Sequence, residues 1–376
     1  MAFISKEQWY ALLYLAGITI GAGVLTLPYV FEQAGMLVGT IELVGMTVIV
    51  LLVTLYLAEI VLRTKGHHEV TGLAEIYLGK KGKFFLVAVS IFYIYGAIIA
   101  YITGLGDALE GIIGVDPFVG GMIVFFIVAA LVFFGLKEVT RAEVLLTPFI
   151  FFIILFLFFT TFSQINTDNY LEVNKEHALM PLGPLFFAML GFWCVPEMRK
   201  IIKDDRKLKQ TIIWGVCGIG VTYFFLIFIV VGITGENTTP IFSEGVTTHI
   251  GQGIGILLHL FAFFTLITSF IGLSFTLKEM YEIDYRLNNT IAWGATFAVP
   301  FLFLLFVQLE FLQIIILTGG IASVFVLLVV VIMFHQAKKY GKRRPEFSLP
   351  VPLWANILIM GICLFMAIQI LLKYAG

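Results

Sequence analysis

The chain has 376 residues, of which 60% are hydrophobic, 15% aromatic and only 12% charged, and its mean hydropathy is +1.03. This composition excludes a soluble globular domain and indicates a polytopic membrane protein, in which the position of charges matters more than their net value of -1. The cysteines Cys194, Cys217 and Cys363 all lie in apolar segments, which favours packing roles over a disulfide framework or a metal site.

Several segments are long and apolar enough to cross about 30 Å of hydrocarbon as helices, which takes roughly 20 residues each. In chain order, the eleven predicted spans cover residues 9–31, 37–62, 84–106, 118–136, 144–163, 180–198, 210–233, 251–277, 290–307, 311–334 and 353–373. The weakest boundary is the turn 308–310 between the ninth and tenth spans. No linker divides the chain, so we expect one polytopic membrane domain over residues 1–376.

The basic residues predict the orientation. If the N-terminus is cytoplasmic, all 23 Lys and Arg residues except Lys175 and Lys373 fall on the cytoplasmic side. This asymmetry satisfies the positive-inside rule, and one missed or added span would destroy it. We therefore expect a multi-pass cell-membrane protein with its C-terminus outside. The basic clusters then set topology within the lipid bilayer, and no nucleic-acid partner is expected.

Two of the predicted spans carry the same interruption. The first span contains Gly21-Ala22-Gly23-Val24-Leu25-Thr26-Leu27-Pro28, and the sixth contains Gly191-Phe192-Trp193-Cys194-Val195-Pro196. Glycine loosens a helix and proline removes one of its hydrogen bonds, so each span should break in the membrane. The freed backbone groups must face protein, water or a ligand. Interrupted helices at corresponding places in two halves of a chain point to the binding site of a secondary transporter.

The break in the first span offers backbone groups of positive and of negative partial charge. The outer half-helix would begin with free amides, which suit a carboxylate, and the inner half would end with free carbonyls, which suit cations. The candidate substrate residues of this span are Thr19, Gly21, Ala22, Gly23 and Val24, and the carbonyls left for cations lie near Gly17, Thr19 and Ile20. An alternative interpretation is that Gly17 and Gly21 are a small-residue motif for close helix packing.

The break in the sixth span should complement the first. Carbonyls of Phe186, Phe187 and Ala188 would end its outer half and could accept hydrogen bonds from an ammonium group, while Gly191 permits the turn. Together the two breaks fit a zwitterion. Aromatic residues that could line the side-chain pocket are Tyr93 and Tyr95 in the third span and Phe186, Phe187, Phe192 and Trp193 in the sixth.

The sequence also resembles a known family. The segment Ala16 to Pro28 resembles the first helix of the amino acid/polyamine/organocation superfamily, most closely its amino acid/auxin permease and aromatic amino acid permease branches. Phe186 to Glu197 resembles their sixth helix, and Thr268 to Gly272 resembles their eighth. The resemblance implies an all-α, LeuT-type fold. Inverted repeats would cover about residues 9–163 and 180–334, and the extra helix 353–373 would lie outside them. It also implies symport of an amino acid by alternating access, coupled to sodium or protons.

The coupling ion has two candidates. In the fold that the sequence resembles, a sodium site lies between the first and eighth helices; the matching groups are the carbonyls of Gly17, Ile20 and Thr265 and the hydroxyls of Thr268 and Ser269. Alternatively, such hydroxyls only bond to the preceding turn of their own helix. Proton-coupled relatives can replace the ion with a lysine of the fifth helix. Span 144–163 contains no lysine, so we expect sodium as the coupling ion; the alternative is a proton, which the aromatic amino acid permease resemblance favours.

His259 is the ionisable residue expected near the midpoint of a span, so it could carry a proton instead of packing as a neutral side chain. Glu59 and Glu197 lie near cytoplasmic span ends, close in sequence to Arg63 and Arg199, and are interpreted as gate or anchor carboxylates. No charged residue is expected beside the central site, which favours a neutral amino acid, because a charged side chain would lose its solvation there.

Other functional classes fit less well. The chain shows no Ser-His-carboxylate arrangement, His/Glu zinc motif or pair of catalytic carboxylates at recognisable spacing, so we expect no enzyme and no cofactor beyond the coupling ion. A channel or an amino acid sensor with the same broken helices is the stronger alternative. The sequence leaves open which amino acid is bound and the oligomeric state.

Overall fold

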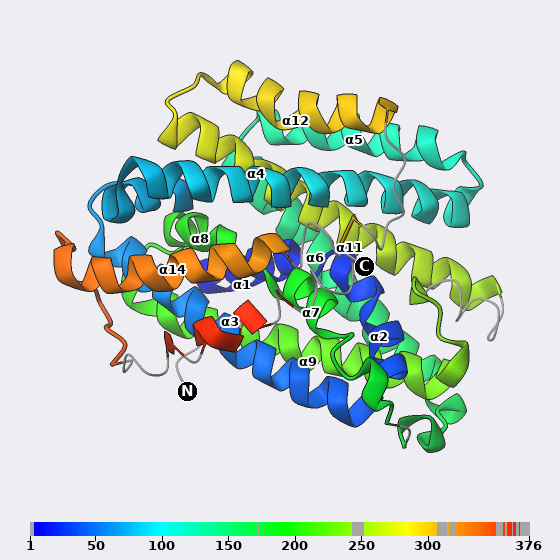
Figure 1. The fold of residues 1–376 in the computed structure, drawn as a ribbon. Helices are drawn as coiled ribbons and strands as arrows, with labels where there is room; N and C mark the ends of the chain where they lie inside the picture. Colours follow the sequence, from blue (N-terminus) through cyan, green and yellow to red (C-terminus); the bar gives the residue numbers. More distant parts are fainter. Residues whose placement is uncertain are drawn as a thin grey trace.

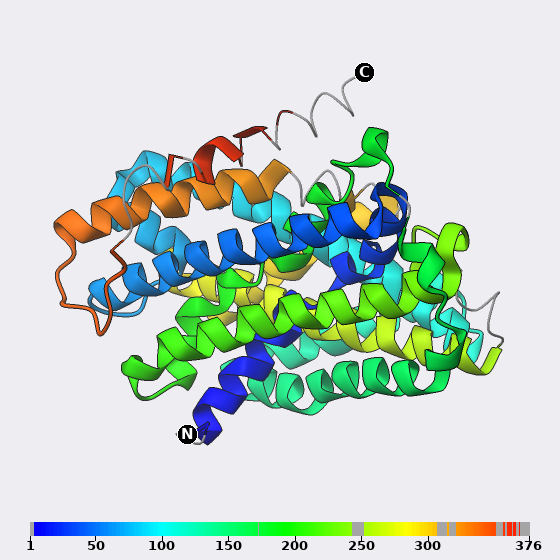
Figure 2. The same ribbon diagram turned by 90° about the horizontal axis from the view of Figure 1, so that it is seen from below.

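The protein is a bundle of long helices. The computed structural model describes residues 4–171, 173–242, 252–306, 314–315, 321–350, 356–357, 359–362, 364–365 and 368. The long helices run roughly along one common axis (Figure 1), and the view from below shows α3 and α9 alongside each other (Figure 2). The regular elements of these residues are all helical.

The remaining helices are long and mostly apolar, and the one that begins at Val70 is kinked at Gly79, which has φ 73° and ψ -173°. They are α3 (Met36–Arg63), α4 (Val70–Ile113), α5 (Pro117–Phe133), α6 (Leu136–Thr161), α9 (Leu208–Thr234), α11 (Gln252–Glu279), α12 (Asn289–Phe306) and α14 (Ile321–Tyr340). In the described part of the chain, 6 helices are long and apolar enough to cross a membrane, namely α3, α4, α6, α9, α11 and α14; α5 and α12 are shorter. The protein is therefore an all-helical, multi-pass membrane protein.

The first and sixth predicted spans are each broken into two short helices. The first consists of α1 (Lys6–Thr19), the 3-10 turn η1 (Ala22–Leu25) and α2 (Leu27–Ala34). The sixth consists of α7 (Leu182–Met189), the 3-10 turn η5 (Phe192–Cys194) and α8 (Val195–Ile201). Pro28 and Pro196 lie in the first turns of α2 and α8, where a missing amide costs least, so each proline begins the second half.

Both predicted interruptions are confirmed. The first lies where we expected it, because α1 ends at Thr19. The second also lies where we expected it: α7 continues through Met189, one residue beyond the expected carbonyls, and Leu190 then leaves the helical region, with φ -80° and ψ 56°.

Some predicted span limits are wrong. The fifth span was expected to begin at residue 144, but α6 begins at Leu136, and α14 continues to Tyr340, beyond the predicted limit of 334. In both places the mean hydropathy falls where charged residues begin, and this set the predicted limit. The helix itself continues, because charged side chains can lie on its exposed part. The turn 308–310, the start of the tenth span and most of the span 353–373 lie outside the described residues.

The helices place the two breaks at the centre of the bundle. Helix α1 packs against α6, α9, α11 and α8, and α11 also packs against α4. Residues 11 and 13–28 and residues 183–198 are all buried. By contrast, large apolar side chains such as Ile41, Phe126, Phe152 and Phe159 are exposed on the outside of the bundle, as expected for a surface in contact with lipid.

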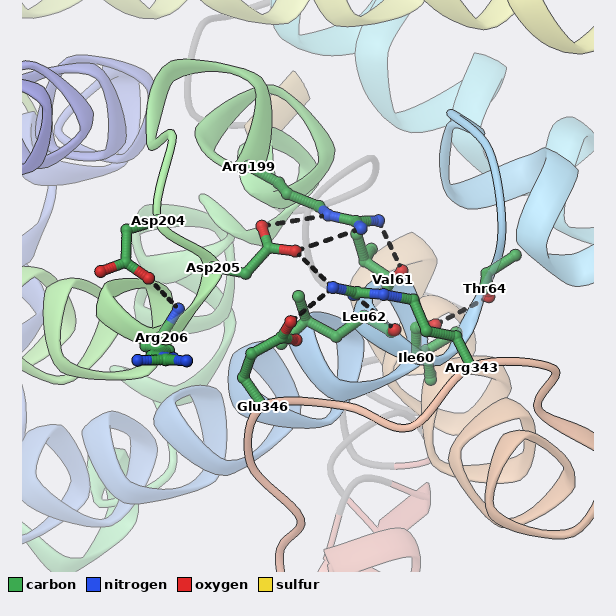
Figure 3. Close-up of polar contacts among 10 residues, drawn as sticks. All are labelled: Ile60, Val61, Leu62, Thr64, Arg199, Asp204, Asp205, Arg206, Arg343 and Glu346. Carbon is green, nitrogen blue, oxygen red and sulfur yellow. Dashed lines mark hydrogen bonds and ion pairs between the residues drawn. The ribbon is translucent and has the colours of Figure 1, made fainter.

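One end of the bundle, here called the basic end, holds the start of α1, the ends of α3, α8 and α14 and the start of α9, with their Lys and Arg residues. There the segment 341–350 after α14 returns across α3 (Figure 3). Arg343 Nη1 donates to the Leu62 carbonyl at 2.9 Å, and Arg199 Nη1 donates to the Val61 carbonyl at 2.8 Å. These guanidinium groups supply donors to carbonyls at the C-terminal end of α3, where the Val61 carbonyl otherwise accepts a long bond of 3.3 Å from the Thr64 amide.

Asp205 joins the two arginines. Its Oδ2 lies 3.3 Å from Arg199 Nη2 and 3.0 Å from Arg343 Nη2 (Figure 3). The Glu59 carboxylate holds the same returning segment, because it accepts from Arg63 Nε at 2.8 Å and from the Leu349 amide at 2.7 Å. The expectation that Glu59 anchors the end of its helix agrees with these contacts.

We predict that Asp205→Asn lowers the free energy of unfolding by about 1–2 kcal/mol, because two partly buried guanidinium groups lose their shared counter-charge. The matched control is Asp204→Asn, since Asp204 is exposed and its Oδ1 accepts only from the Arg206 amide in a cap that asparagine preserves. Thermal unfolding in detergent compares the two variants. Equal midpoints for Asp205→Asn and Asp204→Asn would show that this network does not stabilise the basic end.

Candidate functional site

The carbonyls freed at the end of α1 are met by a serine of α11. Ser269 Oγ lies 2.8 Å from the Gly17 carbonyl oxygen and 3.1 Å from that of Ile18. After Ile20 the chain is extended at Gly21, with φ -126° and ψ -145°. A Cβ atom added to Gly21 would lie 2.4 Å from Ser269 Oγ and 3.2 Å from Tyr101 Oη. The glycine therefore allows hydroxyl groups of α11 and α4 to approach the broken backbone.

Tyr223 of α9 connects the two breaks. Its buried hydroxyl oxygen lies 2.6 Å from the Ala188 carbonyl oxygen of α7 and 3.0 Å from the Thr19 carbonyl oxygen of α1. A phenol has one proton to donate, so it cannot fully satisfy both acceptors. The Thr19 carbonyl also accepts from the Gly21 amide at 3.0 Å. A carbonyl oxygen can accept two hydrogen bonds, so the Ala188 carbonyl keeps its capacity to accept another one.

The two breaks are in direct backbone contact. A Cβ atom added to Gly23 would lie 2.6 Å from Ala188 Cα, and one added to Gly191 would lie 1.7 Å from Thr19 Oγ1. The prediction that the breaks face each other is confirmed. Close packing by small residues, the alternative interpretation, also applies here, because the glycines permit this contact.

The amides at the start of η1 form the donor side of the candidate site. The Val24 amide already donates to the Gly21 carbonyl at 3.2 Å. Ala22 and Gly23, the first residues of the 3-10 turn, have no acceptor for their amides within it. Ala22 and Gly23 are therefore the donors available to a carboxylate, whereas Val24 is engaged in the local fold.

The end of α7 forms the acceptor side. The Leu190 amide donates to the Phe187 carbonyl at 3.4 Å and not to that of Phe186, its usual helical partner. The carbonyls of Phe186 and Ala188, both buried, therefore lie at the break without an i+4 amide. Amides of η1 without a helical acceptor and carbonyls of α7 without an i+4 amide thus lie on opposing, contacting segments, and the Ala188 carbonyl among them accepts from Tyr223.

Aromatic rings surround the second break. The Tyr93 ring centroid lies 5.7 Å from that of Phe187 and 6.2 Å from that of Trp193, and Trp193 stacks on Phe192 at 5.2 Å. The structure does not bring Tyr95 to this cluster. Tyr95 Oη lies 2.7 Å from the Ala295 carbonyl oxygen and 3.1 Å from Tyr281 Oη, on the side of α4 that faces α12.

The predicted sodium ligands are only partly connected. Gly17 and Ser269 are joined directly, as described above. Thr268 Oγ1 donates within its own helix, to the Phe264 carbonyl at 2.9 Å, and Thr265 Oγ1 donates to the Ala262 carbonyl at 2.9 Å. These two hydroxyls follow the alternative interpretation of back-bonding to the preceding turn. The Thr268 hydroxyl also lies 3.1 Å from the Thr265 carbonyl oxygen. Neutral oxygens of this kind suit a small hard cation, and sodium binding by them stays a prediction.

The expected position of His259 is wrong. His259 is half-buried and lies only seven residues after Gln252 in α11. A Cβ atom added to Gly111, near the end of α4, would lie 2.4 Å from its ring. The imidazole therefore lies toward the end of the bundle opposite the basic end, whereas the midpoint of α11 falls near Thr265 and Leu266.

Sequence reasoning missed a carboxyl group beside α1. Glu143 of α6 is fully buried, and its Oε2 accepts a hydrogen bond from Thr147 Oγ1 at 3.2 Å. A Cβ atom added to Gly17 would lie 1.8 Å from Oε2. The expectation that no charged residue lies beside the breaks is therefore wrong on the α1 side.

A signal for Glu143 was present in the sequence. Glu143 precedes the predicted span 144–163 by one residue, so hydropathy placed it outside the membrane. The buried residues of α6 recur at helical spacing: Val139, Glu143, Thr147, Ile150, Ile154 and Leu157. Extending this apolar stripe toward the N-terminus by one turn would have placed Glu143 on the buried face.

A second acidic group lies between the breaks and the basic end. Lys200 Nζ lies 3.2 Å from Glu69 Oε1 and 2.5 Å from Glu279 Oε2, and fully buried Glu197 lies beside Glu69. Burial raises the pKa of the Glu69 carboxyl, the charge of Glu197 adds to this effect, and Lys200 opposes it. Glu197 therefore belongs to this cluster, whereas Arg199, its neighbour in sequence, pairs with Asp205.

Comparisons with known proteins agree with this architecture. The sequence model of the "Tryptophan/tyrosine permease family" matches residues 5–372. The chain is similar to "Tyrosine-specific transport system 1" of Haemophilus influenzae, with 25% identity over 95% of this chain and 94% of the relative. It is also similar to "Glutamine transporter 2" of Aliivibrio fischeri, with 23% identity over 77% of this chain and 79% of the relative. These matches point to a transporter and not to an enzyme.

We predict that Gly23→Ala abolishes stabilisation by a bound neutral amino acid, with tyrosine as the probe. Ligand at about 100 times Kd should stabilise the wild type by about 2.7 kcal/mol. The added methyl group would separate η1 from Ala188 and disturb both sides of the candidate site. Thermal unfolding with and without tyrosine measures this difference.

The matched control is Gly218→Ala on α9, where an added Cβ atom meets nothing within 4 Å. This variant should keep the full ligand-induced shift. An unchanged shift in Gly23→Ala would place the binding site away from the breaks.

Proposed function

The chain belongs to the tryptophan/tyrosine permease family, and from this premise we propose that it is a symporter that moves a neutral L-amino acid across the cell membrane by alternating access. The observation that supports this proposal most strongly is the contact between η1 and the end of α7. Two helix ends of opposite partial charge meet there inside an apolar bundle.

In this proposal the two breaks hold the backbone of the amino acid. The carboxylate accepts hydrogen bonds from the amides of Ala22 and Gly23. The ammonium donates to the carbonyls of Phe186 and Ala188 and to that of Thr19, which competes with Ala188 for the Tyr223 hydroxyl. Both charged groups of the substrate exchange water for preorganised backbone dipoles, which offsets part of the cost of removing them from water.

The proposed side-chain preference follows from the rings near the second break. Tyr93, Phe187 and Trp193 form an apolar, aromatic wall, which favours an aromatic side chain through stacking and burial. Tyrosine is the first choice because the H. influenzae relative is described as tyrosine-specific. Glutamine, the substrate named for the A. fischeri relative, is also neutral.

Alternating access would use the repeated architecture of the chain. We propose a LeuT-type fold in which residues 9–163 and 180–334 are inverted repeats and the helix within 353–373 lies outside them. The basic end is cytoplasmic, as the distribution of Lys and Arg favours, which puts the N-terminus inside and the C-terminus outside. In the described conformation both breaks are buried, as expected for a state closed to both sides.

A cation gradient would drive accumulation. A sodium ion would take its oxygens from Gly17, Ile20, Thr265, Thr268 and Ser269, and a proton would need a titratable side chain nearby. An amino acid sensor with the same breaks is the competing function. It would bind the amino acid without moving it.

Counterflow in proteoliposomes tests the proposal. Vesicles loaded with unlabelled tyrosine should take up labelled tyrosine transiently, with protein-free vesicles as the control, and no ion gradient is needed. Tryptophan, phenylalanine and glutamine should compete, whereas glutamate and lysine should not, because a charged side chain would be desolvated without a partner. Stabilisation by tyrosine without counterflow would favour a sensor, and competition by glutamate or lysine would overturn the neutral specificity.

A further inference from the structure

A groove lies at the basic end between the start of α6 and the inner halves of the two broken spans. It has a volume of about 600 Å³, and most of its lining residues belong to α6, with Tyr10 from α1 and Ile201 from α8. Helix α1 packs against α6 (Figure 2). This α6 groove shares no residue with the candidate amino acid site, so it is a separate feature of the molecule.

The groove side of α6 changes from cationic to apolar along the helix. Lys137 and Arg141 are one helical turn apart at the start of α6, and Val144 and Leu145 follow them. The cations therefore lie nearest the basic end, and the apolar side chains lie deeper in the membrane.

The outer face of α6 continues this apolar surface. Large side chains are exposed there at helical spacing after Leu145, namely Phe149, Phe152 and Phe156. The helix rises by about 16 Å from Leu145 to Phe156, close to half of the hydrocarbon thickness of about 30 Å. A phospholipid has the same order of groups, because its headgroup lies at the membrane surface and its acyl chains reach the middle of the bilayer. The groove and this face therefore match a phospholipid in polarity and in length.

Three cationic side chains surround the groove. Lys137 and Arg141 line it directly. Lys6 Nζ lies 5.4 Å from the ring centroid of Tyr10, which lines the groove from the α1 side. Lysine and arginine at the membrane surface attract anionic lipids. The charge of the groove thus favours an anionic headgroup over a zwitterionic one.

The acidic residues nearby do not cancel this charge. Glu138 pairs with Arg141, whose Nη1 lies 2.6 Å from Glu138 Oε1. Glu7, one turn before the tyrosine of the groove, lies within electrostatic reach of Lys203 and Lys207. The other two cations of the groove therefore remain in excess.

We propose that the α6 groove binds a phospholipid with an anionic headgroup. The phosphate lies against Lys137 and Arg141. Thr140 also lines the groove, and its buried hydroxyl, which has no hydrogen-bond partner among the described residues, donates to a phosphate or ester oxygen. The acyl chains pass Val144 and Leu145 and continue along the outer face of α6.

A lipid in this groove connects α6 to both broken spans. Helices α1 and α8 are the inner halves of those spans, and each contributes a residue to the groove. A ligand favours the conformation that holds its complete site, so the lipid stabilises the packing of α1 and α8 against α6. This inference does not rest on the proposed transport function, because lipid binding is measured without an amino acid.

Thermal unfolding in detergent with and without added lipid tests the proposal. The probes are dioleoyl phosphatidylglycerol, which is anionic, and dioleoyl phosphatidylcholine, which is zwitterionic. We expect phosphatidylglycerol to raise the unfolding midpoint of the wild type more than phosphatidylcholine does. Lys137→Gln combined with Arg141→Gln should raise the phosphatidylglycerol concentration for half-maximal stabilisation by about fivefold for each cation lost. The matched control is Lys80→Gln combined with Lys81→Gln, two exposed lysines of α4 outside the groove, and it should keep the wild-type response.

A second variant separates the groove from general electrostatic attraction. Val144→Phe fills the groove without a change in charge, so it should remove most of the stabilisation by phosphatidylglycerol. If this variant is not recovered folded, a photoactivatable phosphatidylglycerol locates the site in the wild type. The label should then be found within residues 136–145, where α6 lines the groove.

Four results would overturn the proposal. An equal loss of response in the Lys80→Gln, Lys81→Gln control would show attraction by the basic end as a whole. A full response in Val144→Phe, or a label found only outside the groove, would place the lipid elsewhere. Equal stabilisation by the two lipids would contradict the preference for an anionic headgroup. Full stabilisation by glycerol phosphate alone would show a site for a soluble phosphate and not for a lipid.

Discussion

The structure depends on one constraint: a helix that breaks inside hydrocarbon must find partners for the backbone groups that the break frees. At the end of α1, Ser269 meets the carbonyls of Gly17 and Ile18, and Tyr223 is shared between Thr19 and Ala188. The remaining groups, the first amides of η1 and carbonyls at the end of α7, lie where the two broken helices touch. These groups can still form hydrogen bonds, which distinguishes a binding site from a structural kink. The surrounding helices supply the donors that hold the breaks in place.

The location of the breaks could be predicted from the sequence because its cause is local. Glycine and proline act on their own backbone, so the repeated spacing in two apolar segments was sufficient. The partners of the breaks could not be predicted in this way, because Tyr223 and Tyr101 reach them through tertiary packing. Tyr95 was predicted together with Tyr93 to line the pocket, but the two side chains point in different directions. Residues two apart on a helix differ by about 200° in direction, so Tyr93 faces the second break and Tyr95 faces α12.

Glu143 illustrates the limit of hydropathy as a guide to membrane depth. Lys137, Glu138 and Arg141 share the first turns of α6 with Glu143 and lower the mean hydropathy of any sequence window there. Of these four residues, only Glu143 is fully buried. Helical periodicity distinguishes a charged residue on the buried face of a helix from one on its exposed face, whereas composition does not. Glu143 lies close to the first break, because the first span contacts it at Gly17 of α1 and contacts Ala188 at Gly23 of η1.

The most direct test of the central claim is an experimental structure of the protein with tyrosine bound. We predict density for the amino acid between η1 and the end of α7, with its carboxylate within hydrogen-bond distance of the amides of Ala22 and Gly23 and its ammonium facing the carbonyls of Phe186 and Ala188. Tyrosine bound elsewhere in the bundle, with the Ala22 and Gly23 amides directed to protein acceptors, would contradict the assignment of the breaks as the amino acid site.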